Sequence, residues 1–152
     1  MIRFITALIF IAGIHVGVSA QSARADEVSG TYWNAEKTSH IQIYRAINGK
    51  YYGKIVYLKQ PNDKYGQPKT DPENPNKSLR SRKRLGMLIM HNFAWNASES
   101  RWDNGTLYDP VSGSTYDGYM YFKGSNRSTL YLRGYVMGMT WLGRTSEWTR
   151  IK

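Results

Sequence analysis

Residues 40–58 read HIQIYRAINGKYYGKIVYL, two apolar and aromatic runs separated by Asn48-Gly49. The first run alternates, so that Ile41 and Ile43 share one face of a strand and the residues between them share the other. Asn-Gly favours the positive φ angles of a type I′ turn, whose twist suits two paired strands. The sequence therefore predicts a β-hairpin with strands at 40–45 and 50–58.

The same rhythm continues toward the C-terminus. Turn residues interrupt the chain about every ten residues, and the segments between them are rich in Tyr, Ile, Val, Thr and Trp. Residues 109–113 (DPVSG) and 123–126 (KGSN) are two of these turns, because Pro fixes φ and Gly relieves the crowding that follows. Further strands are predicted at 28–33, 86–93, 105–108, 115–123, 128–136 and 144–151.

Short consecutive connections imply an antiparallel meander. A sheet of about eight strands in a small domain usually closes on itself, because closure removes the exposed edges. We therefore predict an all-β fold, an antiparallel up-and-down barrel, with a two-sheet sandwich as the alternative. The 152 residues allow one domain, which is predicted over residues 26–152.

Residues 59–84 break the rhythm with four prolines and almost no apolar side chains, so they cannot form a central strand. A connection of this length is predicted to be either an ordered flap over one barrel mouth or a mobile loop. A short helical turn is expected at Ser78–Ser81. Residues 71–76 offer oxygens to calcium but lack the pattern of an EF-hand loop, so a solvated loop is expected there.

The N-terminal residues 1–25 have the features of a secretory signal. Arg3 precedes an apolar run over 4–18, and small residues follow it. Cleavage is predicted after Ala25, with Ala20 as the alternative site. The apolar run is shorter than the ~20 residues that a membrane helix needs. We therefore predict a periplasmic or secreted protein, with no integral membrane span after cleavage.

Catalytic and metal-binding patterns are sparse. The chain has no Cys, and its His residues outside the predicted signal are His40 and His91, which make a poor metal site. The sequence patterns of zinc proteases, α/β-hydrolases and phosphate-binding loops are not found in it. Asp103, Asp109 and Asp117 could pair as glycosidase carboxylates do, but the first two each head a turn and are expected to cap it. We predict no catalytic residue, metal or cofactor.

The chain is basic, with 21 Lys and Arg against 11 Asp and Glu and a net charge of +10. Arg80, Arg82, Lys83 and Arg84 form a run that attracts phosphates, anionic glycans or lipid head groups. These four residues are candidate contacts to an anionic partner, and a solvated face that aids solubility is the alternative. Basic residues among aromatics also suit nucleic acid, but export argues against that partner.

Aromatic residues are unusually frequent, with 12 Tyr, 5 Trp and 4 Phe. Inward Tyr side chains either fill a small barrel or line a cavity with polar groups for a ligand. A filled interior is the expectation, because eight strands leave room for side chains or one small guest. Tyr116, Arg133 and Tyr135 are the candidate ligand contacts, since they combine ring surface or donors with strand positions.

Several short motifs occur in order between Gly30 and Arg150. They are Gly53-Lys54-Ile55-Val56, Asp71 with Asn74-Pro75, Leu79-Arg80-Ser81-Arg82 with Gly86, Gly105-Thr106-Leu107-Tyr108-Asp109-Pro110 with Gly113 and Tyr116, Leu132-Arg133-Gly134-Tyr135, and Gly143-Arg144-Thr145-Ser146-Glu147-Trp148-Thr149-Arg150. Together they resemble the bacterial family known as domain of unknown function 2147. The resemblance implies a secreted, single-domain barrel of lipocalin-like topology without an established activity or catalytic residues.

Two features depart from the family pattern. Members usually begin G-x-W, whereas this chain has Tyr32 at the Trp position, so the plug of one barrel end is expected to use Tyr32 or Trp33. In lipocalin-like barrels such a ring commonly packs beneath a late Arg, here Arg144 or Arg150. Many members also have a Cys pair around the first hairpin, which this sequence lacks.

These observations favour an exported, non-enzymatic barrel that binds a small apolar or amphipathic ligand. The alternative is an envelope interaction protein that binds an acidic polymer, lipid head groups or a protein partner through its basic surface. An enzyme is the third possibility, and it would need a polar cluster among Asp103, Asp109, His91 and Arg133. The volume and polarity of the interior distinguish the first two hypotheses.

Overall fold

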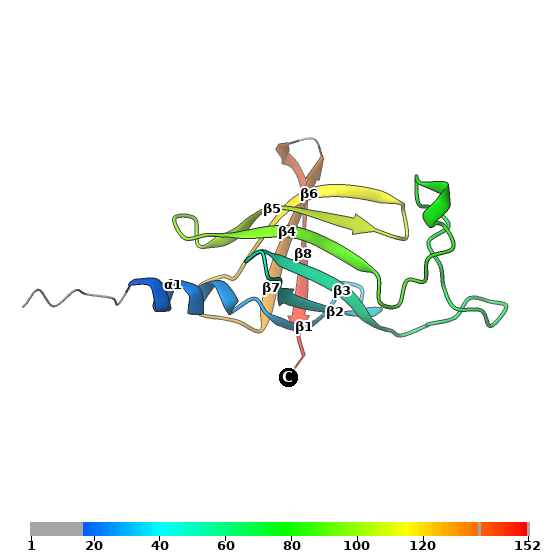
Figure 1. Ribbon diagram of the computed structural model, residues 1–152, viewed down its shortest axis with the longest axis horizontal. Helices are drawn as coiled ribbons and strands as arrows, with labels where there is room; N and C mark the ends of the chain where they lie inside the picture. The colour runs from blue at the N-terminus through cyan, green and yellow to red at the C-terminus, as the bar shows by residue number, and fades with distance from the viewer. Residues whose placement is uncertain (1–16, 137, 152) are drawn as a thin grey trace, which may run out of the picture.

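The computed structural model describes residues 17–136 and 138–151, which form a closed eight-stranded barrel (Figure 1). All neighbouring strands are antiparallel, and the first strand pairs with both the second and the last. The predicted up-and-down barrel is therefore confirmed, and the two-sheet sandwich is wrong. The strands are β1 Gly30–Trp33, β2 Ser39–Arg45, β3 Tyr51–Leu58, β4 Leu88–Asn96, β5 Arg101–Asp109, β6 Ser114–Tyr121, β7 Thr129–Val136 and β8 Met139–Arg150.

Two short helices accompany the barrel, α1 Gly17–Asp26 and the 3-10 helix η1 Lys77–Leu79. Helix η1 confirms the helical turn expected near the end of the long loop. Most of the apolar run of the predicted signal lies outside the described residues. In the part of the chain that the structure describes, no helix has the length and apolar character to cross a membrane.

The first hairpin has the predicted faces but a different turn. Ile41 and Ile43 are buried, whereas Gln42 between them is exposed. Gly49 has a φ of 75°, and its N–H donates to the Ala46 carbonyl at 2.9 Å, while Asn48 lacks a positive φ. The type I′ prediction was therefore wrong, and a longer turn with one left-handed glycine takes its place.

Strand β5 begins earlier than predicted because an Asp-Asn-Gly sequence lies inside it. The pairing with β6 shifts between Trp102 and Gly105, and Asn104 has a φ of 58°. These residues form an irregularity within a strand rather than a turn. Asp103 therefore does not cap a turn; it accepts hydrogen bonds from Arg101 Nε at 2.6 Å and Asn96 Nδ2 at 2.8 Å.

One half of the barrel interior is filled with large side chains, and we call it the filled half. It lies at the end that holds α1 and the β2–β3, β4–β5 and β6–β7 turns. Gly105 gives it room, because a Cβ there would overlap the Phe93 ring. Gly53 does the same for Met90, whose Sδ would lie 2.6 Å from a Cβ. The buried side chains of this half are Val28, Tyr32, Ile43, Tyr51, Met90, Phe93, Trp102, Met120 and Leu130.

Tyr32 and Arg150 close this end. The Arg150 guanidinium lies 4.7 Å from the centre of the Tyr32 ring and donates to the Ser29 carbonyl at 2.9 Å. Burial raises the pKa of the Tyr32 hydroxyl, which donates to the Val28 carbonyl at 2.9 Å. The expected ring beneath a late Arg is confirmed for this pair.

The end of α1 contributes to the same plug. Ala25 is buried, and its carbonyl accepts a hydrogen bond from Trp102 Nε1 at 2.9 Å. The Asp26 carboxylate accepts from the Tyr51 hydroxyl at 2.6 Å. Figure 1 shows α1 and the long loop at opposite ends of the molecule, so the plug lies far from that loop.

Candidate functional site

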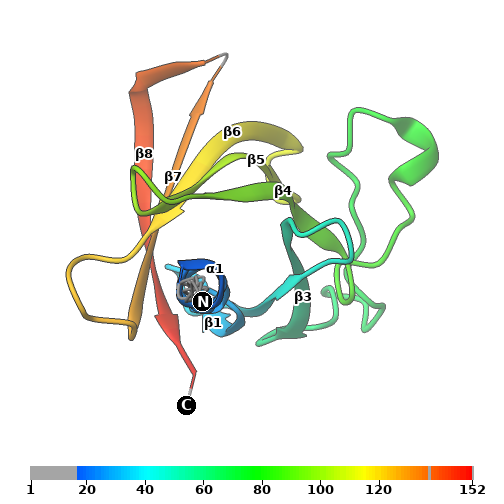
Figure 2. The same cartoon turned by 60° about the vertical axis from the view of Figure 1, so that its left-hand side comes forward.

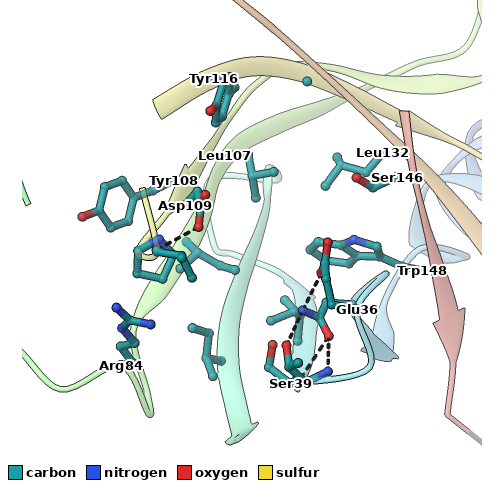
Figure 3. Close-up of a pocket in the computed structure, with 18 of the residues that line it drawn as sticks. Glu36, Ser39, Arg84, Leu107, Tyr108, Asp109, Tyr116, Leu132, Ser146 and Trp148 are labelled. Atoms are coloured by element: carbon teal, nitrogen blue, oxygen red, sulfur yellow. Dashed lines mark hydrogen bonds between the residues drawn. The ribbon is translucent and has the colours of Figure 1, made fainter. Parts of the chain in front are cut away.

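The other half of the interior, which we call the hollow half, contains a cavity of about 950 Å³. Its mouth is formed by the β1–β2, β3–β4, β5–β6 and β7–β8 connections, at the end opposite α1. Figure 3 shows Leu107, Leu132 and Trp148 around one space, with Tyr116 above and Ser39 below. The expectation of a filled interior therefore holds for one half of the barrel and not for the other.

Small inward residues make this half hollow. Alternate positions of a strand face the interior, and on β7 and β8 these include Gly134 and Ser146, both at the cavity wall. Ser39 of β2 is also buried at the wall. These three positions carry little volume, so the side chains opposite them do not meet. The remaining wall is apolar, with Ile41, Ile55, Leu58, Ile89, Leu107, Leu132 and Trp148.

Charged side chains border the mouth. The cations are Lys59, Lys69, Arg84 and Arg144, and the carboxylates are Glu36 and Asp109. Within residues 17–136 and 138–151, no salt bridge engages any of these four cations. Arg84 Nε donates to the Thr70 carbonyl at 2.7 Å, a contact that leaves its charge uncompensated.

Both carboxylates at the mouth have local hydrogen-bond partners. Asp109 accepts from the Val111 N–H at 2.9 Å and from the Ser112 hydroxyl at 2.7 Å, so its predicted role as a turn cap is confirmed. Glu36 accepts from Asn34 Nδ2 at 2.9 Å. Because four cations border the mouth against two carboxylates, the net charge there is positive, and it favours an anionic group on a guest.

A buried polar cluster holds the long loop beside the mouth. The Asp71 carboxylate is fully buried and accepts from Tyr108 Oη at 2.6 Å, Asn74 Nδ2 at 2.8 Å and Arg82 Nη2 at 2.9 Å. Burial raises the pKa of Asp71, but these hydrogen bonds outweigh it and hold that pKa below its usual value. The solvated loop expected here was therefore wrong for Asp71 and Asn74, which anchor the loop.

The basic run belongs largely to this anchor. Arg82 pairs with Asp71, and Arg80 Nε donates to the Asn74 carbonyl at 2.8 Å. Lys83 is exposed and pairs through its backbone with Thr70. Arg84 alone of the four lies at the cavity. Contact of the run with an anionic partner stays a prediction, and the structure gives three of its side chains an internal role.

The three candidate ligand contacts lie in different places. Tyr116 lines the cavity. Tyr135 borders it, but its ring packs against Tyr119 with centroids 6.3 Å apart, on the strand face that alternation turns outward. Arg133 donates to the Thr140 carbonyl at 2.7 Å and to Thr145 Oγ1 at 3.2 Å, across the β7–β8 hairpin. The structure thus brings one of the three side chains to the cavity.

Several cavity residues were missed from the sequence, above all Ser146, Trp148 and Arg144. They occupy every second position of β8, and their shared face was the available signal. The pattern was hard to use because outward residues of that strand are also polar and aromatic. Ser39 was missed for a different reason, since a serine next to a turn looks solvent-exposed in sequence.

The two histidines pack against aromatic rings. The centroid of the His40 ring lies 4.0 Å from that of Trp33 and 4.4 Å from that of Tyr57. The His91 and Tyr52 ring centroids are 6.2 Å apart. Burial lowers the pKa of His91. Over the described ranges 17–136 and 138–151, no group of three or more metal-ligating side chains is found.

Comparisons with known proteins agree with this architecture. The fold is similar to protein HP1028 from the human pathogen Helicobacter pylori, whose structure is described as belonging to the lipocalin family. The sequence identity is 23%, the match covers 82% of this chain and 83% of that chain, and the TM-score is 0.67. No curated protein matches the sequence. Because residues 30–150 match its pattern, the chain belongs to the family described as "Uncharacterized protein conserved in bacteria (DUF2147)".

Proposed function

We propose that this protein is an exported barrel that binds a small amphipathic molecule with an acidic head group, without performing chemistry on it. The observation that carries the proposal is the hollow half, with an apolar wall and uncompensated cations at its mouth. Its volume of about 950 Å³ lies at the upper end of the range usual for small-molecule sites. The lipocalin-like fold is consistent with this use of a barrel.

The cavity suggests how such a guest would lie. An apolar tail would contact Ile55, Leu107 and Trp148, which removes apolar surface of both partners from water. The head group would remain at the mouth, within the positive field of Arg84 and Arg144. Tyr116 would contact the guest near the mouth. This orientation lets the charged group keep part of its hydration, which avoids the cost of burying it.

Export is the second part of the proposal, and the structure bears on the cleavage site. Cleavage after Ala25 would remove the residue whose side chain is buried in the plug and whose carbonyl accepts from Trp102 Nε1. Cleavage after Ala20 would leave these contacts in place. We therefore propose that the exported chain begins at Gln21.

Calorimetric titration tests the binding proposal. Wild-type protein is titrated with dodecanoate and with dodecanol, and we expect the acid to bind more tightly because the mouth is positive. Ser146→Trp places a large side chain in the cavity and should weaken dodecanoate binding by about tenfold or more. Thr115→Trp adds the same side chain on the outer, exposed side of β6 and should bind like wild type.

The charge at the mouth is tested in the same assay. Arg144→Gln should weaken dodecanoate about two- to fivefold and leave dodecanol unchanged. Lys50→Gln removes an exposed cation at the opposite end of the barrel and serves as the control. Absence of binding by either probe, or equal loss in the Ser146 and Thr115 variants, would reject the proposal.

A further inference from the structure

Exposed apolar side chains gather around the mouth of the cavity. Val111 of the β5–β6 turn and Leu142 of the β7–β8 hairpin both line the cavity, yet they are 69% and 62% exposed. Trp141 is 74% exposed beside Leu142, and Val136, which pairs with Met139, is also exposed on the same hairpin. Among the described residues, the turns of the opposite end carry one exposed large apolar side chain, Ile47. The apolar exposure is therefore concentrated at one end.

The hairpin presents these side chains on an ordered support. Figure 2 shows it reaching beyond the ring formed by the other strands. Arg133 lies across it and bonds to the Thr140 carbonyl and to Thr145 Oγ1. Gly143 permits this approach, because a Cβ there would lie 3.1 Å from Arg133 Nε and 2.8 Å from the Gly134 carbonyl oxygen. These bonds tie β7 to β8 next to Trp141, whose side chain is exposed.

Cations surround this apolar rim. Arg144 lies two residues after Leu142 on β8, while Arg84, Lys59 and Lys69 border the same mouth. Exposed apolar side chains with a Trp, flanked by cations, suit the boundary of an anionic bilayer. There the apolar side chains enter the acyl region, and the cations meet lipid phosphates. A protein interface fits less well, because Lys is depleted at such interfaces.

We propose that this end of the barrel docks on an anionic phospholipid bilayer, with Trp141 and Leu142 inserted below the head groups. The cavity mouth would then open toward the lipid, since Leu142 belongs to both the rim and the cavity wall. The inference goes beyond the proposed function, because docking needs no guest in the cavity. Of the basic run it uses only Arg84, because Arg80 and Arg82 anchor the long loop.

Vesicle cosedimentation of the full chain tests this inference. The probes are vesicles of phosphatidylcholine alone and of phosphatidylcholine mixed with phosphatidylglycerol. We expect wild type to bind the anionic vesicles, and Trp141→Ser to reduce the partition coefficient about tenfold. Arg144→Gln should reduce it about fivefold on anionic vesicles. Ile47→Ser removes a fully exposed apolar side chain from the opposite end and should bind as wild type does.

A second measurement reports insertion directly. Vesicles with brominated acyl chains should quench part of the wild-type tryptophan fluorescence, and that part should be absent from Trp141→Ser. Far-UV circular dichroism shows whether each variant is folded. We expect Trp141→Ser to fold, because the Trp141 side chain is exposed. Dodecanoate titration of Trp141→Ser without vesicles separates this inference from the proposed function, since guest binding should persist. The inference would be overturned if wild type failed to bind anionic vesicles, or if Ile47→Ser lowered the partition coefficient as much as Trp141→Ser. A protein partner would then be the remaining explanation for the exposed apolar side chains.

Discussion

The two halves of the barrel are built from the same strands and differ in what those strands turn inward. In the filled half, Tyr51, Phe93 and Trp102 meet across the interior and exclude solvent. In the hollow half, Ser146 and Gly134 occupy equivalent inward positions and leave a cavity. The closed barrel provides the container, and the size of its inward side chains determines where a guest can fit.

Glycine shows this difference most directly. Gly105 is a position where a neighbour uses the missing side chain, because the Phe93 ring occupies that volume. Gly134 is a position where the volume stays open, since the nearest atom to a Cβ there is Tyr116 Cβ at 3.5 Å. Glycine therefore allows a neighbouring ring to pack closely in the filled half, and it leaves the cavity open in the hollow half.

The largest effect is expected from truncating a core ring. Phe93→Ala in the filled half should lower the free energy of unfolding by about 3–5 kcal/mol, because it leaves a cavity among tightly packed side chains. Leu107→Ala in the hollow half should cost less, about 1–2 kcal/mol, since that side chain already borders open space. Urea denaturation of both variants measures the difference. Equal losses would mean that the two halves are packed alike.

Adding a methyl group at Gly105 or Gly134 should also affect the two halves differently. Gly105→Ala should destabilise the protein by about 1–3 kcal/mol, because the Phe93 ring must move. Gly134→Ala should cost less than about 0.5 kcal/mol, since its new methyl group makes an ordinary contact. Thermal unfolding followed by circular dichroism compares them. A tolerated Gly105→Ala together with a damaging Gly134→Ala would contradict the assignment of the halves.

The closed barrel could be predicted from the sequence, but not which part of its interior is open. Alternation at Ile41 and Ile43 and the Pro-Gly turn after Asp109 depend on local rules, so the closed meander was predictable. The hollow half depends on which inward residues face one another across the barrel. That arrangement places Ser146 and Trp148 of β8 around the same cavity as Ile41 of β2, and no local pattern contains it.

The long loop illustrates a second limit. Its prolines and polar residues predict the absence of a strand, which is correct for most of residues 59–84. For residues 71–76 a solvated loop was expected, whereas Asp71 and Asn74 are buried. The reason is that Arg82 of the same loop and Tyr108 of β5 complete the hydrogen bonding of Asp71, and the composition of the loop contains no sign of the contact to β5.

The Asp71 carboxylate, which anchors the long loop beside the hollow half, should make the stability of the protein depend on pH. Asp71→Asn should cost about 2 kcal/mol near neutral pH, because it weakens charge-assisted hydrogen bonds. The folded pKa of Asp71 is lowered, so the ionised group stabilises the folded state above the unfolded pKa of about 4. That contribution is lost as the pH falls through the folded pKa. Urea denaturation at several pH values should therefore show wild type and variant converging below about pH 4.

The smallest effect concerns the plug of the filled half. A chain that begins at Asp26 should be about 1–2 kcal/mol less stable than one that begins at Gln21, because Trp102 Nε1 loses its buried acceptor. Thermal unfolding of the two chains measures this difference. The intact mass of the exported protein identifies the natural start. A mass that corresponds to Asp26 would contradict the proposed cleavage after Ala20.

Binding of a guest in the hollow half is tested by soaking a crystal of the protein with ω-bromododecanoate, because bromine can be located by its anomalous signal. We expect a single bromine position in the hollow half, among Ile55, Leu107 and Trp148, with the carboxylate toward Arg84 and Arg144. A hollow half that stays empty while the probe binds on the outer surface would contradict it. So would bromine among Tyr51, Phe93 and Trp102.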